Sequence, residues 1–154
     1  MTKIKKKPIE FYNYKDEVSS LDRRSSDIIE FINTKIASLQ TLEEIIDFLF
    51  INIQELIPCD RISVSFFEEN GKRASIYYVK ANYSGIKLAK GYSADINNSS
   101  LEKVFADETP RIINDLQEYL KNHPASDTTL LLVKEGINSS ITAPLSVENR
   151  PVGL

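Results

Sequence analysis

The residues of this chain that could do chemistry are few and scattered. Its 154 residues include one cysteine, Cys59, and one histidine, His123. A metal site needs several ligands at short, regular spacings, and a nucleophilic enzyme needs a nucleophile beside a base. The sequence has neither pattern, and it lacks a glycine-rich phosphate loop and a glycine-serine nucleophile elbow. We therefore expect no enzymatic activity and no metal site.

The isolated polar residues have simpler interpretations. His123 precedes a proline in a polar loop, where an exposed structural role is favoured over ligand binding or proton transfer. Cys59 follows a proline at the joint between an expected helix and an expected strand, which suits a small buried filler. The acidic pairs at 68–69 and 107–108 are at element ends, where solvated surface charge is usual.

Charge and hydropathy limit the partners of the chain. The net charge of -3 provides no positive electrostatic potential that would attract a polyanion, and the basic run at 3–7 is confined to the N-terminus. We therefore expect no nucleic-acid partner. No segment approaches the roughly 20 apolar residues of a membrane span, so we expect no membrane contact for this domain. A single cysteine excludes an internal disulfide and favours a cytoplasmic location.

The N-terminal part divides into an arm and a helix. Residues 1–20 are polar and mixed, which predicts an arm or linker. Residues 21–39 predict a helix with a narrow apolar stripe, and near-heptad spacing favours a two-chain coiled coil. A single helix lying on its own domain is the alternative. The residues expected at the dimer interface are Leu21, Ile28, Ile32 and Leu39.

Residues 40–154 predict one α+β domain. Thr41 and Glu44 form a capping box that starts a second, broader amphipathic helix. Alternating strands at 61–67 and 74–83 flank a polar turn, which predicts a hairpin, and a third strand is expected at 86–91. Short helices and a small strand then precede a final pair of strands. This order predicts a mainly antiparallel sheet with helices on both faces.

The last residues suggest an incomplete sheet. Residues 137–145 predict a strand, 148–151 a turn, and 152–154 the beginning of a returning strand. A ribbon buries its apolar face only when both arms are present. The expectation is that this sequence is a piece of a longer protein and that the final strand is truncated.

Several segments in this order resemble the GAF domain, a sensor module of signalling proteins. Pro58-Cys59-Asp60-Arg61 is similar to the joint between that family's first core helix and first strand, and Ile112-Ile113-Asn114-Asp115 to the short strand that follows its pocket-side helix. The segment 132–145 is the closest match, and it resembles the helix, glycine and fifth strand of many bacterial members of the family. The resemblance covers residues 40–154 and implies a central antiparallel sheet of about five to six strands.

The resemblance also implies a function. A GAF-like domain of a bacterial signalling protein would bind a small organic molecule between the sheet and its short helices, and relay this to an output domain in the same full-length chain through a dimeric helix. No covalent cofactor is expected, because Cys59 does not lie on a pocket-side helix. The alternative is a ligand-free homodimerisation or interaction module with the same fold. Strand alternation and this resemblance suggest the following ligand-binding residues: Tyr77, Val79, Ile113, Leu132, Asn138, Ser140 and Thr142.

Overall fold

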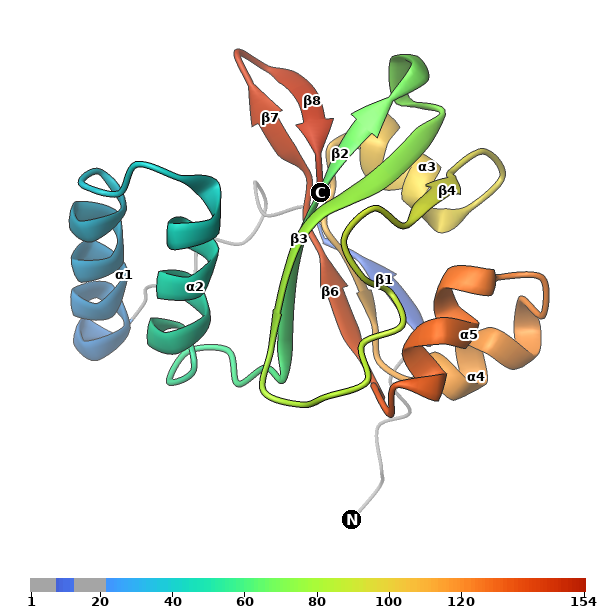
Figure 1. The fold of residues 1–154 in the computed structure, drawn as a ribbon, viewed down its shortest axis with the longest axis horizontal. Coiled ribbons are helices and arrows are strands. Elements are labelled where there is room, and N and C mark those ends of the chain that lie inside the picture. Colours follow the sequence, from blue (N-terminus) through green and yellow to red (C-terminus); the bar gives the residue numbers. More distant parts are fainter. Residues whose placement is uncertain (1–7, 13–21) are drawn as a thin grey trace.

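The structure is a computed structural model that describes residues 8–12 and 22–154. Figure 1 shows a layer of strands between two groups of helices. On one side lie α1 (Arg23–Ile36) and α2 (Leu42–Asn52), and on the other lie α3 (Ser100–Asp107), α4 (Leu116–Asn122) and α5 (Asp127–Lys134). This arrangement confirms the predicted α+β class with helices on both faces.

By backbone pairing, the strands form two antiparallel sheets. The five-stranded sheet has the order β4-β3-β2-β8-β7, with bounds β2 (Arg61–Glu68), β3 (Arg73–Ala81), β4 (Ser93–Asp95), β7 (Leu145–Val147) and β8 (Arg150–Gly153). The three-stranded sheet has the order β1-β5-β6, with bounds β1 (Ile9–Phe11), β5 (Arg111–Ile113) and β6 (Ser140–Thr142). Only residues 143–144 separate β6 from β7, so the expected single sheet is divided by a short interruption in one strand.

The β2–β3 hairpin confirms its prediction, but the expected third strand is displaced. The single-turn helix η1 (Glu69–Gly71) connects β2 to β3 through three residues with positive φ. The prediction of a strand at 86–91 is wrong, because β3 has no partner in most of this segment. Pairing begins where Gly91 N donates to the Ile76 carbonyl, and the regular strand β4 starts only at Ser93.

The α1 helix is shorter than the predicted 21–39. Asp22 caps its N-terminus, because its Oδ1 accepts the Ser25 N–H at 2.9 Å. Leu39 lies beyond the end of the helix, and Leu21 lies outside the described residues.

The apolar stripe of α1 packs within the chain. Ile32 is 6% exposed, Ile28 is half-buried, and the Phe31 ring lies 5.8 Å from the Phe48 ring of α2. Figure 1 shows α1 lying on the outer side of α2. This is the arrangement of the alternative interpretation, a helix that lies on its own domain, and it leaves dimerisation of the chain an open expectation.

Part of the N-terminal segment expected to be an arm is a strand. Ile9 to Phe11 pair with Ile113 to Arg111 along β5. Ile9 packs against the buried cluster of Ile113, Leu116 and Tyr119. The alternation of Ile9, Glu10 and Phe11 is too short to predict a strand without knowledge of the β5 edge that it covers.

A buried carboxylate joins three distant segments. Glu135, at the end of α5, accepts from Arg61 Nη1 of β2 at 2.8 Å and from the backbone N–H groups of Lys87 and Leu88 at 2.7 and 2.6 Å. Tyr83 Oη also donates to it. Burial acts to raise the pKa of Glu135, but these hydrogen bonds and the Arg61 charge outweigh burial, and its pKa is lowered. The carboxylate is therefore ionised and fully engaged.

No helix in the described parts of the chain has the length and apolar character needed to cross a membrane.

We expect Arg61→Met to destabilise the fold by about 3–5 kcal/mol, because it leaves the buried Glu135 charge without its ionic partner. The side chains of Arg61 and Glu135 are 7% and 0% exposed. The matched control is Arg24→Met, since Arg24 pairs with Glu55 at 79% and 59% exposure, and its loss should change stability by less than about 1 kcal/mol. Urea unfolding of both variants measures the difference. Equal urea midpoints for the two variants would show that the buried pair does not stabilise the fold more than the exposed pair does.

Candidate functional site

Arg111, the first residue of β5, lies at the centre of a buried polar cluster. Its Nη1 donates to Ser100 Oγ of α3 at 2.6 Å, and its Nη2 donates to Thr142 Oγ1 of β6 at 2.8 Å. The Ser100 hydroxyl also shares a hydrogen bond of 2.8 Å with the Tyr119 hydroxyl of α4, whose side chain is buried. One guanidinium therefore connects two strands and two helices.

The cluster contains buried polar atoms that lack a hydrogen-bond partner. Among the described residues no carboxylate pairs with Arg111, and both its Nε and the nearby Ser140 Oγ are buried without a hydrogen-bond partner. Burial lowers the pKa of Arg111 to about 10, so the side chain stays protonated at neutral pH. Since one pKa unit corresponds to about 1.4 kcal/mol, holding this charge costs the folded state roughly 3 kcal/mol. Such a group is complementary to an anion.

Four of the seven predicted ligand-binding residues surround this cluster. Thr142 pairs with Arg111 across the sheet, and Ser140 pairs with Ile113. The side chains of these two pairs therefore lie on the same face of the sheet. Leu132 of α5 packs against the buried group that contains Ile113. The cluster therefore has a polar end at Arg111 and an apolar floor beside it.

Two predicted residues lie outside the cluster. Val79 is half-buried in β3, in the other sheet, on the face opposite to α2. Asn138 is exposed before β6, and its backbone carbonyl accepts the Leu116 N–H at 2.8 Å.

Tyr77 lies on the opposite face from the one expected. Val64 pairs with Tyr78 and Ser65 pairs with Ile76, so Tyr77 is the extra residue of a β-bulge. Tyr78 Oη donates to Asp47 of α2 at 3.0 Å, and a hydrogen bond with Glu43 of the same helix raises the pKa of Tyr77. Both tyrosines thus face α2, whereas Val79 does not. Simple alternation, which placed Tyr77 and Val79 on one face, fails at the bulge.

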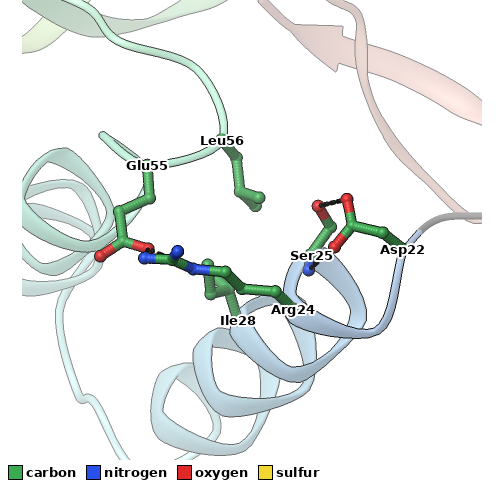
Figure 2. Close-up of a pocket in the computed structure, with 6 residues that line it drawn as sticks. All are labelled: Asp22, Arg24, Ser25, Ile28, Glu55 and Leu56. Carbon is green, nitrogen blue, oxygen red and sulfur yellow. Dashed lines mark hydrogen bonds and ion pairs between the residues drawn. The ribbon is translucent and has the colours of Figure 1, made fainter.

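Two surface hollows lie away from this cluster. Figure 2 shows the first, of about 310 Å3, where Arg24 of α1 reaches to Glu55 at 2.7 Å; it is lined by Asp22, Arg24, Ser25, Ile28, Glu55 and Leu56. The second, of about 380 Å3, is lined by Phe67, Asn70, Gly71, Phe105, Pro151 and Val152. None of the predicted ligand-binding residues lines either hollow. In the first hollow Arg24 pairs with Glu55, and the Asp22 carboxylate accepts hydrogen bonds from Ser25, as the dashed lines in Figure 2 mark.

The lone cysteine and histidine have structural contacts. The Gln54 amide accepts from Cys59 N at 3.1 Å and donates to the Cys59 carbonyl at 3.0 Å, which holds the joint between α2 and β2. The His123 ring stacks on Tyr119 at 4.1 Å between centroids. Within residues 8–12 and 22–154, no group of three or more His, Cys, Asp or Glu side chains is placed to hold a metal.

The sequence analysis did not identify Arg111, Ser100 or Tyr119 as site residues. One signal was present, because an arginine opens the short apolar strand Arg111–Ile113. The sequence pattern does not show that its charge is buried without a partner, because that depends on α3 and α4 lying over the strand.

Comparison with known proteins identifies the fold. No family model and no curated protein matches the sequence. Among solved structures, the GAF domain of an Acinetobacter phosphoenolpyruvate-protein phosphotransferase aligns with a TM-score of 0.61 at 16% identity, over 86% of this chain and 75% of that chain. The phycoerythrobilin-bound GAF domain of a cyanobacterial phytochrome aligns with a TM-score of 0.60 at 14% identity, over 86% and 80%.

A third solved structure has higher identity but lower structural similarity. A domain of a putative two-component sensor histidine kinase from Sinorhizobium meliloti 1021 aligns with a TM-score of 0.50 at 21% identity, over 75% of this chain and 70% of that one. These likenesses show that the chain has a GAF-like fold, which confirms the resemblance identified in the sequence.

We expect Arg111→Met to leave the free energy of unfolding unchanged within about 1 kcal/mol, or to raise it by up to about 3 kcal/mol. Methionine keeps the volume of the arginine side chain and removes the free-energy cost of burying its charge. The substitution also removes the two hydrogen bonds that Arg111 donates to hydroxyl groups, and this loss opposes the gain. Urea unfolding beside Arg61→Met gives the comparison of an unpaired with a paired buried arginine. A loss of 3 kcal/mol or more would show that Arg111 is a structural residue.

Proposed function

We propose that this chain is a regulatory, non-enzymatic domain that binds a small organic anion at Arg111 and relays its presence to an output domain of a cytoplasmic bacterial signalling protein. The observation that carries the proposal is the buried guanidinium without a counter-charge. A fold that retains such a group loses stability unless an anion compensates it.

The surroundings of Arg111 favour a carboxylate or a group of similar size. Arg111 and the unpartnered Ser140 hydroxyl supply hydrogen-bond donors, and Thr142 lies beside them. Guanidinium groups bind planar oxyanions through paired, charge-assisted hydrogen bonds. The apolar neighbours Ile113 and Leu132 suit the carbon skeleton of the same molecule.

Ligand binding would change the packing of the helices. Arg111 now bonds the Ser100 hydroxyl of α3, and Ser100 in turn bonds Tyr119 of α4. An anion that takes over the guanidinium releases these hydroxyls and shifts α3 and α4 relative to β5. A ligand that prefers one of two such arrangements shifts their populations, which is the basis of a relay.

The structural comparisons support a place in signalling. The solved domains of this fold come from a phosphotransferase, a phytochrome and a putative sensor histidine kinase. These similarities support a role in signalling by analogy of fold alone. The Arg111 cluster supports anion binding through its chemistry.

We expect at least one compound from a panel of small mono- and dicarboxylates and phosphate esters to stabilise the wild-type chain. At a concentration one hundred times Kd the stabilisation is about 2.7 kcal/mol, which for a domain of this size raises Tm by roughly 5–10 °C. Thermal shift measurements at millimolar anion compare the wild type with Arg111→Met, which should lose the response, and with Arg24→Met, which should keep it.

Two results would contradict anion binding at Arg111. One is a stabilisation that Arg111→Met retains, which would place the anion elsewhere. The other is the absence of any stabilising compound, which would favour the alternative of a ligand-free interaction module.

We further propose that the domain acts as a homodimer through the outer surface of α1 and α2. Phe31 of α1 is 47% exposed and Ile51 of α2 is 69% exposed, and the Phe31 ring lies 5.8 Å from the Phe48 ring of α2. This surface replaces the predicted seam at Ile28 and Ile32, because that seam is already occupied by α2. A dimer formed here would place the α1 helices of both chains side by side.

We expect Phe31→Ser combined with Ile51→Ser to convert this dimer into a monomer at micromolar concentration, since the two side chains supply the largest exposed apolar area on these helices. Native mass spectrometry or sedimentation velocity measures the oligomeric state. Val147→Ser is the matched control, because Val147 is 59% exposed on β7. A wild-type monomer, or a double variant that stays dimeric, would refute this interface.

A further inference from the structure

The N-terminal strand β1 lies directly beside the Arg111 cluster. In the register of the three-stranded sheet, Phe11 of β1 is opposite Arg111 of β5, and Arg111 is opposite Thr142 of β6. Directly opposed residues of neighbouring strands project their side chains from the same face of a sheet. Phe11, Arg111 and Thr142 therefore form one row of side chains across the sheet, with the guanidinium in the middle.

Phe11 and Arg111 form the closer of the two kinds of antiparallel pair. The next pair along the strands carries a backbone hydrogen bond, because the Tyr12 N–H donates to the Pro110 carbonyl at 2.9 Å. Hydrogen-bonded and non-hydrogen-bonded pairs alternate along an antiparallel ladder, so the pair of Phe11 and Arg111 is non-hydrogen-bonded. The Cα atoms of such a pair are about 4.5 Å apart, which brings its side chains together.

The side chains of β1 on this face also contact the elements around the cluster. Ile9 packs against the buried apolar group beside the cluster, and Phe11 is half-buried. The Lys103 ammonium of α3 lies 4.4 Å from the centre of the Phe11 ring, and the same helix accepts a hydrogen bond from Arg111 through Ser100. Strand β1 thus closes the side of the cluster that is opposite to β6.

Docking of β1 changes the solvation of the Arg111 charge. The Phe11 ring replaces water beside the guanidinium with apolar surface, and burial lowers the pKa of Arg111 to about 10. While the charge has no counter-charge, removing this water costs free energy and opposes docking of the strand. A carboxylate at the guanidinium lowers that cost, because a paired charge depends less on water.

We propose that docking of β1 and compensation of the Arg111 charge stabilise each other, so that β1 closes over an organic anion bound at Arg111, with Phe11 as one wall of the site. The part that concerns a bound anion rests on the function proposed above. By linkage, the docked strand raises anion affinity by the factor by which the anion favours docking. Because β1 precedes α1 in the chain, the strand adds a moving element to the relay through α3 and α4.

A carboxylate built into β1 tests the coupling without an added ligand. Phe11→Glu places a carboxylate opposite Arg111, and Phe11→Gln is the matched neutral variant. Hydrogen exchange of the Tyr12 and Asn114 amides reports docking of β1, because both donate to backbone carbonyl groups across the pair of β1 and β5. We expect the protection of both amides to be at least about tenfold greater in Phe11→Glu than in Phe11→Gln. The difference should disappear when Arg111→Met is added.

Two controls separate this coupling from other effects. Tyr12 bonds Glu10 on the opposite face of β1, so Tyr12→Glu and Tyr12→Gln, measured at the Asn114 amide, should show no difference that depends on Arg111. The buried Ile76 amide, in the other sheet, reports opening of the whole domain, and all protection is compared with it.

Three results would overturn the inference. They are equal or lower protection in Phe11→Glu than in Phe11→Gln, a difference that persists in the Arg111→Met background, and a carboxylate of the thermal-shift panel that stabilises the wild type and Phe11→Glu equally. The first two measurements need no added anion. Protection that depends on both Glu at position 11 and Arg111, beside a wild type that no anion stabilises, would support the coupling and refute anion binding alone.

Discussion

The carboxylate of Glu135 is the constraint on which the rest of the architecture depends. It ends α5, and its donors come from the first residue of β2 and from the loop that follows β3, at sequence distances of 74 and 47–52 residues. A buried ionised carboxylate requires all of its hydrogen-bond donors to stay in position, because every lost donor leaves part of its charge uncompensated. The same contact therefore fixes where the β2–β3 hairpin begins and where α5 stops. The strand that leaves α5 then starts from a defined position and brings Ser140 and Thr142 to β5.

Local rules predicted the local structure. The capping box of Thr41 and Glu44 and the polar turn between the hairpin strands both depend on residues close in sequence, and both are present as predicted. The parts that were missed depend on distant partners. Strand β1 exists because β5 offers an edge, and Tyr77 changes face because one residue is inserted opposite β2. Thr142 and Ser140 were predicted from strand alternation together with the family resemblance, whereas Arg111 and Tyr119 come together only when α3 and α4 lie over the sheet.

Two buried arginines show why burial alone does not identify function. Arg61 has a carboxylate at 2.8 Å and a backbone carbonyl as partners, so its charge is compensated within the fold. Arg111 has only hydroxyl partners, its Nε has none, and its pKa is lowered by burial. Hydroxyl groups accept hydrogen bonds but do not neutralise charge. The charge of the first arginine is therefore paired within the fold, whereas the second is a buried charge that an anion would compensate. This difference in pairing, and not the depth of the side chain, is the physical argument for a binding site.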